Sequence, residues 1–409
     1  MQSIAQSWLI YRLTGSPALL GAVGFTSQFP VFLLAPLGGI VADRFRRQVL
    51  LIITQTSAMI LAALLAGLTL TGHVRIWHIF VLGAALGVVN AFDIPVRQSF
   101  VVEMVDRPDL MNAIALNSAM FNGARVVGPA LAGLLVSTIG EGWCFAANAV
   151  SYLAVIAGLM RMRMAPGTAQ SPSGSAVAHV LEGFRFVGHT PPIRALLLLL
   201  AMVSLIAMPY VVLMPIFADQ ILHSGARGLG ILMAASGIGA VAGALAVASR
   251  HEVRGLGLWV ALSMGGLGLG LIGFALSRSF WLSAALLVPV GGFMMVQMSA
   301  SNTLIQAMVP DALRGRVMAI YSMMFMGMAP VGALLAGALA SHVGAPLMVA
   351  TGGALATVGA VSFYVRLPAL RPAAQQLLVT QEAEDRGPAH GKTAASGPPT
   401  KSEKRRAPV

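Results

Sequence analysis

The stretch Gly39-Ile40-Val41-Ala42-Asp43-Arg44-Phe45-Arg46-Arg47 lies between two long apolar segments, 19–42 and 48–72. A glycine lets neighbouring helices approach closely, and an aspartate can cap a helix or pair with an arginine of a nearby loop. Arginines that follow an apolar segment stay in the headgroup layer on the inner side of a membrane. The stretch therefore predicts a short inner loop between two membrane helices, with Gly39 at a helix contact.

The composition of the whole chain agrees with this prediction. Hydrophobic residues make up 57% of the 409 residues and charged residues 10%, whereas an ordinary soluble domain has about 25% charged residues. A bilayer core needs about 20 apolar residues per helix. Eleven segments meet this need: 19–42, 48–72, 76–102, 112–138, 143–160, 193–218, 227–248, 255–276, 281–306, 316–341 and 345–365. We therefore expect an all-α integral membrane protein.

The two halves of the chain resemble each other at a constant offset of 204 residues. Matching positions include Val105 and Val309, Phe121 and Phe325, Gly123 and Gly327, Gly133 and Gly337, and Gly140 and Gly344. This repeat predicts two six-helix bundles, an architecture that usually moves solutes.

The first helix is expected to be incomplete. Residues 1–13 would rise about 20 Å, short of a core about 30 Å thick. The expectation is therefore eleven full spans plus a partial one. A start codon assigned too late, a short first helix and an N-terminal deletion each explain this.

These patterns divide the chain into four segments. Residues 1–160 form an N-terminal helical bundle with an incomplete first helix, and residues 193–365 form the C-terminal helical bundle. The linker 161–192 carries an amphipathic piece from Ala176 to Gly188, and both a plain spacer and a regulatory segment fit it. Residues 366–409 are rich in proline, alanine and charge, which predicts a disordered cytoplasmic tail.

The distribution of arginine predicts the orientation. With alternating loops assigned to the inside, thirteen arginines lie there, against Arg12, Arg75, Arg227 and Arg278 outside. Both termini are then cytoplasmic in a full-length form. The net charge of +12 reflects inner loops that face anionic lipid headgroups, not a nucleic-acid site.

Charged residues also occur within the predicted helices. Asp93 and Arg97 lie toward the inner end of the fourth helix, and Arg125 lies near the middle of the fifth. An unpaired charge at the bilayer centre costs at least about 2.5 kcal/mol, so Arg125 should face a cavity and have a partner. Asp93 is the natural partner of Arg125 or Arg97 and the leading candidate for a group that changes protonation during transport. A static ion pair that closes the inner gate is the alternative.

Other polar side chains on apolar helices are candidates for the wall of a central cavity. They are Gln28, Asn90, Asn117, Asn122, Tyr210, Gln297 and Asn302. Hydrogen bonds between helices explain many such residues, so about half are expected to touch a solute.

The stretch around Asp43 resembles the major facilitator superfamily, whose signature in this loop has the form G-x-x-x-D-R-x-x-R-R. The second copy is degraded, because Asp43 corresponds to Val247. The resemblance implies that Asp43, Arg44 and Arg47 form a latch that stabilises the outward-facing state. A loop that only anchors the topology is the alternative.

A second stretch, Ala124-Arg125-Val126-Val127-Gly128-Pro129-Ala130-Leu131-Ala132-Gly133, is similar to the G-x-x-x-G-P-x-x-G-G pattern of exporting branches of the superfamily. Gly128 and Gly133 offer a smooth face to a neighbouring helix, and Pro129 removes a backbone hydrogen bond where a gate can bend. Helix packing without directional meaning is the alternative.

Further segments, among them 91–98 and 112–118, look like the bacterial branch that contains the enterobactin exporter and macrolide efflux proteins. This resemblance implies proton-driven export of a siderophore or drug-like amphipathic molecule from a bacterial inner membrane. A lipid flippase, an uncoupled facilitator and a non-transport scaffold are the alternatives.

The sequence has no phosphate loop, no H-E-x-x-H and no G-x-S-x-G motif, and Cys144 is the single cysteine. We therefore expect no enzyme activity, no metal and no cofactor, with the proton gradient as the energy source. The expected partners are a small-molecule substrate and membrane lipid, with no nucleic acid, and the expected state is a monomer.

Overall fold

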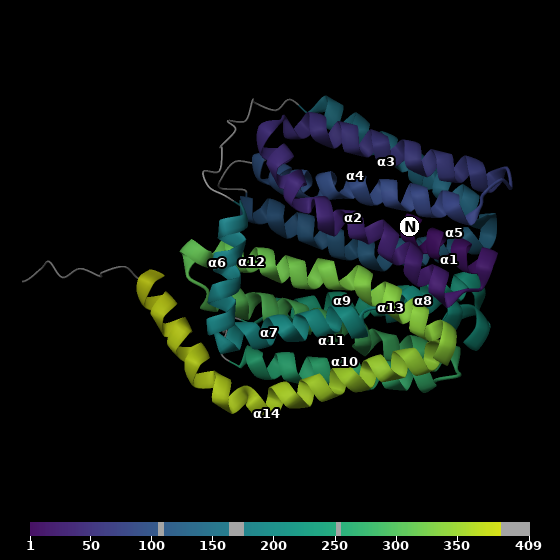
Figure 1. The fold of residues 1–409 in the computed structure, drawn as a ribbon. Coiled ribbons are helices and arrows are strands. Elements are labelled where there is room, and N and C mark those ends of the chain that lie inside the picture. Colours follow the sequence, from purple (N-terminus) through teal and green to yellow (C-terminus); the bar gives the residue numbers. More distant parts are fainter. Residues whose placement is uncertain (105–109, 163–175, 251–254, 386–409) are drawn as a thin grey trace, which may run out of the picture.

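A computed structural model describes residues 1–104, 110–162, 176–250 and 255–385, and the regular elements in these ranges are all helices (Figure 1). The first half contains α1 (Gln2–Thr14), α2 (Pro17–Arg44), α3 (Arg47–Leu70), α4 (Ile76–Glu103) and α5 (Leu110–Arg161). The helix α6 (Ala176–His189) lies in the linker, on the segment for which the sequence predicts an amphipathic helix.

The second half begins with one long helical stretch made of α7 (Pro191–Met202), α8 (Tyr210–Ile216) and the π-helical turns η2 (Val203–Ala207) and η3 (Phe217–Ile221). It continues with α9 (Gly225–Ala248), α10 (Leu256–Leu276), α11 (Phe280–Met308), α12 (Asp311–Ser322), the π-helical turn η4 (Met323–Gly327), α13 (Met328–Val343) and α14 (Ala345–Asp385).

The sequence repeat is a structural repeat. α2 ends at Arg44 and α9 at Ala248, which are 204 residues apart. The same offset links two glycines in left-handed backbone: Gly140 has φ 84° and ψ 169°, and Gly344 has φ 84° and ψ 152°. Residues that carry a side chain rarely adopt a positive φ, so both positions favour glycine. Gly344 separates α13 from α14, and Gly140 interrupts α5 at the equivalent point.

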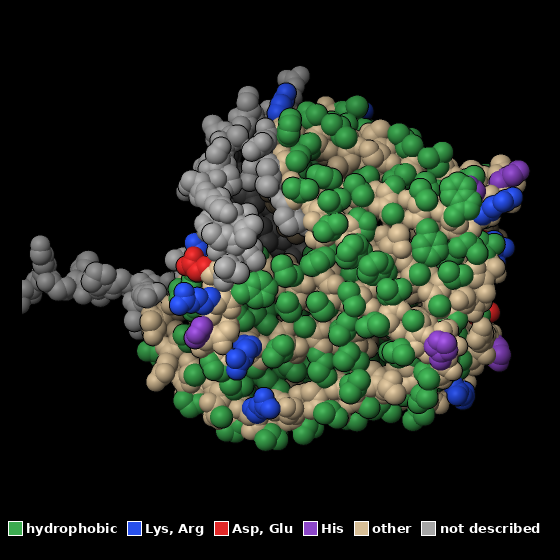
Figure 2. Space-filling view, in the orientation of Figure 1, with side chains coloured by type: hydrophobic (Ala, Val, Ile, Leu, Met, Phe, Trp, Pro, Cys, Tyr) green, Lys and Arg blue, Asp and Glu red, His purple; other side chains and the backbone are tan. Residues whose placement is uncertain are grey.

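Ten helices in the described residues are long and apolar enough to cross a membrane. The sequence predicts eleven full spans, and the difference lies in α5, where the predicted spans 112–138 and 143–160 fall on one helix that is non-helical only at Gly140. The 13-residue α1 is not among the ten. Figure 2 shows hydrophobic side chains across the side of the bundle, with arginines and histidines near its two ends.

The helices form two halves that lie against each other (Figure 1). Within the halves, α2 packs on α4 and α9 packs on α11; between them, α2 packs on α13 and α5 packs on α9. The offset of 204 residues converts the first pair of each kind into the second. We name the end of the bundle that carries α6 and the last part of α14 the linker end, and the other the opposite end (Figure 1).

The predicted disordered tail is wrong for its first part, because α14 continues to Asp385. Leu370, Leu377 and Leu378 pack against the buried core. Their spacing of three to four residues places them on one face of a helix, and this packing outweighs the effect of Pro368 and Pro372 within α14. Residues 386–409 lie outside the described residues.

Candidate functional site

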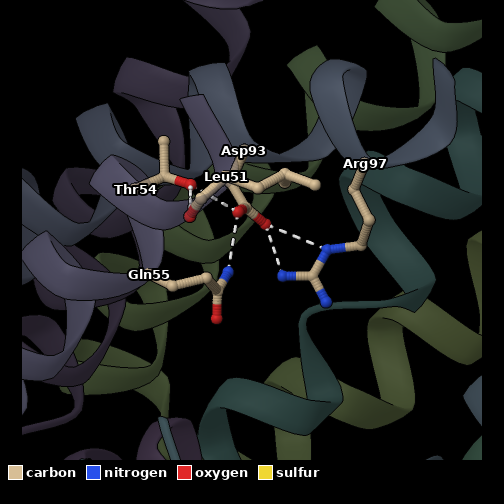
Figure 3. Close-up of polar contacts among 5 residues, drawn as sticks. All are labelled: Leu51, Thr54, Gln55, Asp93 and Arg97. Atoms are coloured by element: carbon tan, nitrogen blue, oxygen red, sulfur yellow. Dashed lines mark hydrogen bonds and ion pairs between the residues drawn. The ribbon is translucent and has the colours of Figure 1, made fainter. Parts of the chain in front are cut away.

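The carboxylate of Asp93 is the centre of a polar cluster on an otherwise apolar part of α4 (Figure 3). Asp93 is only 5% exposed. Gln55 Nε2 donates to Asp93 Oδ1 at 2.7 Å, and Thr54 Oγ1 lies 2.8 Å from the same oxygen. Arg97 donates to Oδ2 from Nε at 3.1 Å and from Nη2 at 2.6 Å. Both carboxylate oxygens therefore have polar partners, as buried polar groups require.

Arg97 is the exposed member of this cluster. It lies one helical turn after Asp93 on α4, so the two side chains meet on one face of the helix. The Arg97 side chain is 56% exposed, whereas that of Asp93 is 7% exposed. The ion pair therefore joins a buried acid to an accessible guanidinium.

The sequence analysis missed Thr54 and Gln55, which lie on α3. Both are buried, at 7% and 5% exposure. The available signal was the polar run Thr54-Gln55-Thr56-Ser57 within an apolar helix. Buried polar groups need hydrogen-bond partners, so such a run indicates a polar neighbour on an adjacent helix.

The equivalent position in the second half has no charge. Asp93 corresponds to Gln297 and Arg97 to Ser301, both on α11 and both 0% exposed. Neither amide atom of Gln297 nor the Ser301 hydroxyl has a hydrogen-bond partner among the described residues. The counterparts of Thr54 and Gln55 are Leu258 and Trp259, which explains why no matching cluster forms there.

The two halves meet closely near the opposite end through pairs of glycines. A Cβ atom on Gly133 of α5 would lie 2.5 Å from Gly230 Cα of α9. A Cβ atom on Gly337 of α13 would lie 2.7 Å from Gly21 Cα of α2. These distances are too short for any side chain, so the glycines allow backbone contact between the halves. Gly133 and Gly337 are equivalent positions of the repeat, so the same kind of close glycine contact occurs twice between the halves.

Two polar contacts lie at the same end. Tyr11 of α1 donates from its hydroxyl to Asp219 Oδ2 of η3 at 2.8 Å, which joins the two halves. Arg12 Nε pairs with Glu141 Oε1 of α5 at 2.8 Å, within the first half.

The structure places the remaining candidates in different surroundings. Tyr210 is buried, and its hydroxyl lies 2.9 Å from Ser236 Oγ of α9. Asn302 accepts from Gln306 Nε2 at 2.8 Å. Gln28 is exposed on α2, and Asn90 is half-buried on α4.

The candidate residues Pro129 and Gly128 of the second motif, and Arg47 of the loop, also lie in different surroundings. α5 continues as a helix through Pro129, and the carbonyl of Pro129 lies at the contact with Gly230. Nothing lies within 4 Å of a Cβ atom built on Gly128. Arg47 begins α3 and is half-buried. The side-chain surroundings of Gly39, Asp43, Arg44, Asn117, Asn122 and Arg125 lie outside the described residues.

The described residues contain no group of three histidine, cysteine or acidic side chains that could hold a metal ion. Asp93 and Tyr210 instead form hydrogen bonds with side chains of neighbouring helices.

Two solved structures of transporters have a similar fold. The chain aligns with a mutant of the nucleoside transporter NupG at a TM-score of 0.75 and 14% identity, covering 89% of this chain and 94% of that one. A D-xylose-proton symporter aligns with a TM-score of 0.72 and 12% identity, covering 89% and 93%. Identities this low show the fold alone.

Relatives with assigned roles are similar over most of their length. The staphyloferrin A transporter of Staphylococcus aureus is 25% identical over 81% of this chain and 83% of that protein. The multidrug efflux pump Tap of Mycolicibacterium fortuitum is 29% identical over 83% and 85%. The enterobactin exporter EntS of Escherichia coli O1:K1 is 27% identical over 74% and 72%.

The family model described as transmembrane secretion effector matches residues 1–388. This match confirms the resemblance that the sequence motifs indicate, and the family consists of transporters, not enzymes. The chain belongs to the transmembrane secretion effector family of the major facilitator superfamily.

Proposed function

We propose that this protein is a secondary active transporter that exports a small amphipathic molecule, a siderophore or a drug-like compound, by proton-coupled alternating access. The observation that carries the proposal is the Asp93 cluster, a buried acid whose partners come from two helices of one half only. The export of siderophores and drugs by relatives supports the substrate class.

The arrangement of the halves supports alternating access. Six helices in each half, with α1 as a shortened first helix, move around a central pathway in this proposal. The Gly133–Gly230 and Gly21–Gly337 contacts hold the halves together near the opposite end. Opening that end requires both contacts to separate, so the structure corresponds to a state that is closed there.

Asp93 has a direct role in this cycle. Protonation of the carboxylate removes the charge that holds Arg97, and the freed guanidinium turns toward water because it is already half exposed. Protonation also weakens the contacts of Thr54 and Gln55 with this carboxylate, and these contacts connect α3 to α4. One proton taken up by Asp93 therefore alters helix packing, which is the event that coupling needs.

The proposal also includes the location, the oligomeric state and the orientation of the protein. It lies in the bacterial inner membrane as a monomer, with the linker end and both termini of a full-length form in the cytoplasm, because positive residues favour that side. The proton gradient supplies the energy without a cofactor, and Asp43, Arg44, Arg47 and Arg125 contribute to gating.

The test is efflux of ethidium and of enterobactin from energised cells, with and without an uncoupler. Asp93→Asn is expected to lower uncoupler-sensitive efflux about ten-fold or more, because hydrogen bonds to a buried charge contribute about 1.5–3 kcal/mol. Glu182→Gln is the matched control, since it also removes a carboxylate that pairs with an arginine, Arg316, but on the linker helix. Its efflux should stay within about two-fold of the parent, because an exposed ion pair contributes at most about 1 kcal/mol.

The double variant Asp93→Asn/Arg97→Gln separates a proton site from a static ion pair. If the pair is only a static contact on α4, the double variant recovers efflux, because no unpaired charge remains. If Asp93 carries the proton, the double variant stays inactive. Efflux that the uncoupler does not change in the parent would favour a facilitator or a lipid flippase and overturn the coupling.

A further inference from the structure

A cavity of about 350 Å³ lies at the linker end of the second half, away from the Asp93 cluster. The last part of α14 covers it, and the ends of α7, α10 and α11 form its other walls. Ligand pockets in proteins range from about 300 to 1,000 Å³, so the cavity is large enough for part of a small molecule or a lipid chain.

The wall of the cavity is almost entirely apolar. It includes Leu196, Leu258, Met308 and Leu378, and among the residues that the structure describes Arg371 is the one charged side chain that lines it. A pocket of this kind fits a hydrocarbon chain, with one cationic contact at its edge.

A second arginine lies beside the cavity. The guanidinium of Arg250 lies 4.4 Å from the centre of the Trp259 ring, and Arg250 Nη1 lies 3.9 Å from the Cβ position of Gly255, which lines the cavity. Arg250 and Arg371 are both exposed, and no described carboxylate pairs with either of them. The rim therefore carries two positive charges.

The depth of the cavity in the bundle matches the headgroup region of a membrane. Trp259 lies in the first turn of the membrane helix α10, and tryptophan is enriched at membrane interfaces. The α14 residues that line the cavity begin at Phe363, in the middle of the apolar span Ala345–Gln381, and end at Leu378, close to the end of this span. An apolar slot below two arginines at this depth is the arrangement that binds an anionic lipid.

We propose that this cavity is a binding site for an anionic phospholipid, with one acyl chain between α14 and the ends of α7, α10 and α11, and with the phosphate at Arg371 and Arg250. The lipid fastens the last part of α14 to the second half. Zwitterionic phospholipid binds less well, because its own positive group opposes the two arginines.

The test uses the purified full chain in neutral detergent, with Trp8, Trp77, Trp143 and Trp281 replaced by Phe so that Trp259 is the one tryptophan left. The protein is titrated with phosphatidylglycerol that carries brominated acyl chains, and the readout is quenching of Trp259 fluorescence. The affinity for phosphatidylglycerol should be at least about five-fold higher than that for phosphatidylcholine with the same acyl chains. Arg371→Gln should lower the affinity for phosphatidylglycerol about five-fold. Each basic residue near a membrane surface contributes a factor of about that size to the affinity for anionic lipid. Arg366→Gln is the matched control, since it removes an exposed arginine of the same helix that does not line the cavity.

A second variant tests the acyl chain. Ala374→Phe places a ring in the cavity and should abolish quenching by both lipids, with correct folding checked by size-exclusion chromatography. Equal affinity for the two lipids in the parent, or the same loss of phosphatidylglycerol affinity in Arg366→Gln as in Arg371→Gln, would overturn the proposal. Competition by millimolar inorganic phosphate would also overturn it, because that result assigns the arginines to a free anion.

Discussion

The hydroxyl of Tyr11 and the carboxylate of Asp219 form a hydrogen bond of 2.8 Å across the boundary between the two halves. The residues are 208 positions apart in sequence, and Tyr11 is only 6% exposed. The bond lies at the end of the bundle where the glycine pairs also meet, so it adds a polar contact between the halves there.

Tyr11→Phe removes the hydrogen bond and keeps the ring. A hydrogen bond to a charged group contributes about 1.5–3 kcal/mol, so the closed state should lose about ten-fold or more in population. The measurement is the rate at which an impermeant maleimide labels Ala226→Cys, in a Cys144→Ser background, since Ala226 lies at the contact with Gly133. Tyr364→Phe is the matched control, because Tyr364 is exposed on α14. Equal labelling of the two variants would contradict a role in closure.

The glycine pairs allow a second prediction with a control on the same helix. Gly133→Ala places a Cβ atom 2.5 Å from Gly230 Cα, so α5 and α9 must separate. We expect a loss of about 1–3 kcal/mol of stability from overpacking and a several-fold loss of transport. Gly128→Ala meets nothing within 4 Å and should be neutral or slightly stabilising, because alanine is the better helix former. Thermal unfolding of the two purified variants makes the comparison, and an equal midpoint would show that the contact does not matter.

The linker helix offers a second pair of glycine variants. A Cβ atom on Gly183 of α6 would lie 3.1 Å from Ile320 Cδ1 and 3.2 Å from Arg316 Cβ of α12, whereas one on Gly188 meets nothing within 4 Å. Gly183→Leu should therefore push α6 away from α12 and break the Arg316–Glu182 ion pair. Limited proteolysis should cut the linker several-fold faster in Gly183→Leu than in Gly188→Leu. The same rate in both would mean that α6 does not depend on this contact.

The sequence predicts the helices and the repeat well, because both depend on local composition. Apolar runs of about 20 residues define spans, and Gly140 and Gly344 keep the same backbone conformation at the same offset. Contacts between distant segments were not predictable in this way. Thr54 and Gln55 became partners of Asp93 only through the packing of α3 on α4, and nothing in the sequence around Tyr11 points to Asp219.

The end of α14 shows a further limit of sequence patterns. Proline, alanine and charge after residue 365 favour disorder, yet leucines at helical spacing pack this segment onto the second half. Tertiary packing makes this segment helical, because the burial of several leucines contributes more free energy than intrinsic helix propensity does.

The last prediction concerns Gln297, the counterpart of Asp93 in the second half. Its side chain is fully buried, and both amide atoms lack a partner among the described residues. A buried polar group without a hydrogen bond costs about 1–3 kcal/mol, so Gln297→Met, which keeps the length of the side chain, should raise the free energy of unfolding by about that amount. Gln55→Met is the matched control, because Gln55 donates to Asp93 at 2.7 Å and its loss should lower the free energy of unfolding. Unfolding of both variants by denaturant in detergent gives the two signs. If Gln297→Met is destabilising as well, a bound water or solute satisfies the amide, and the second half contains a polar site at the same place as the first.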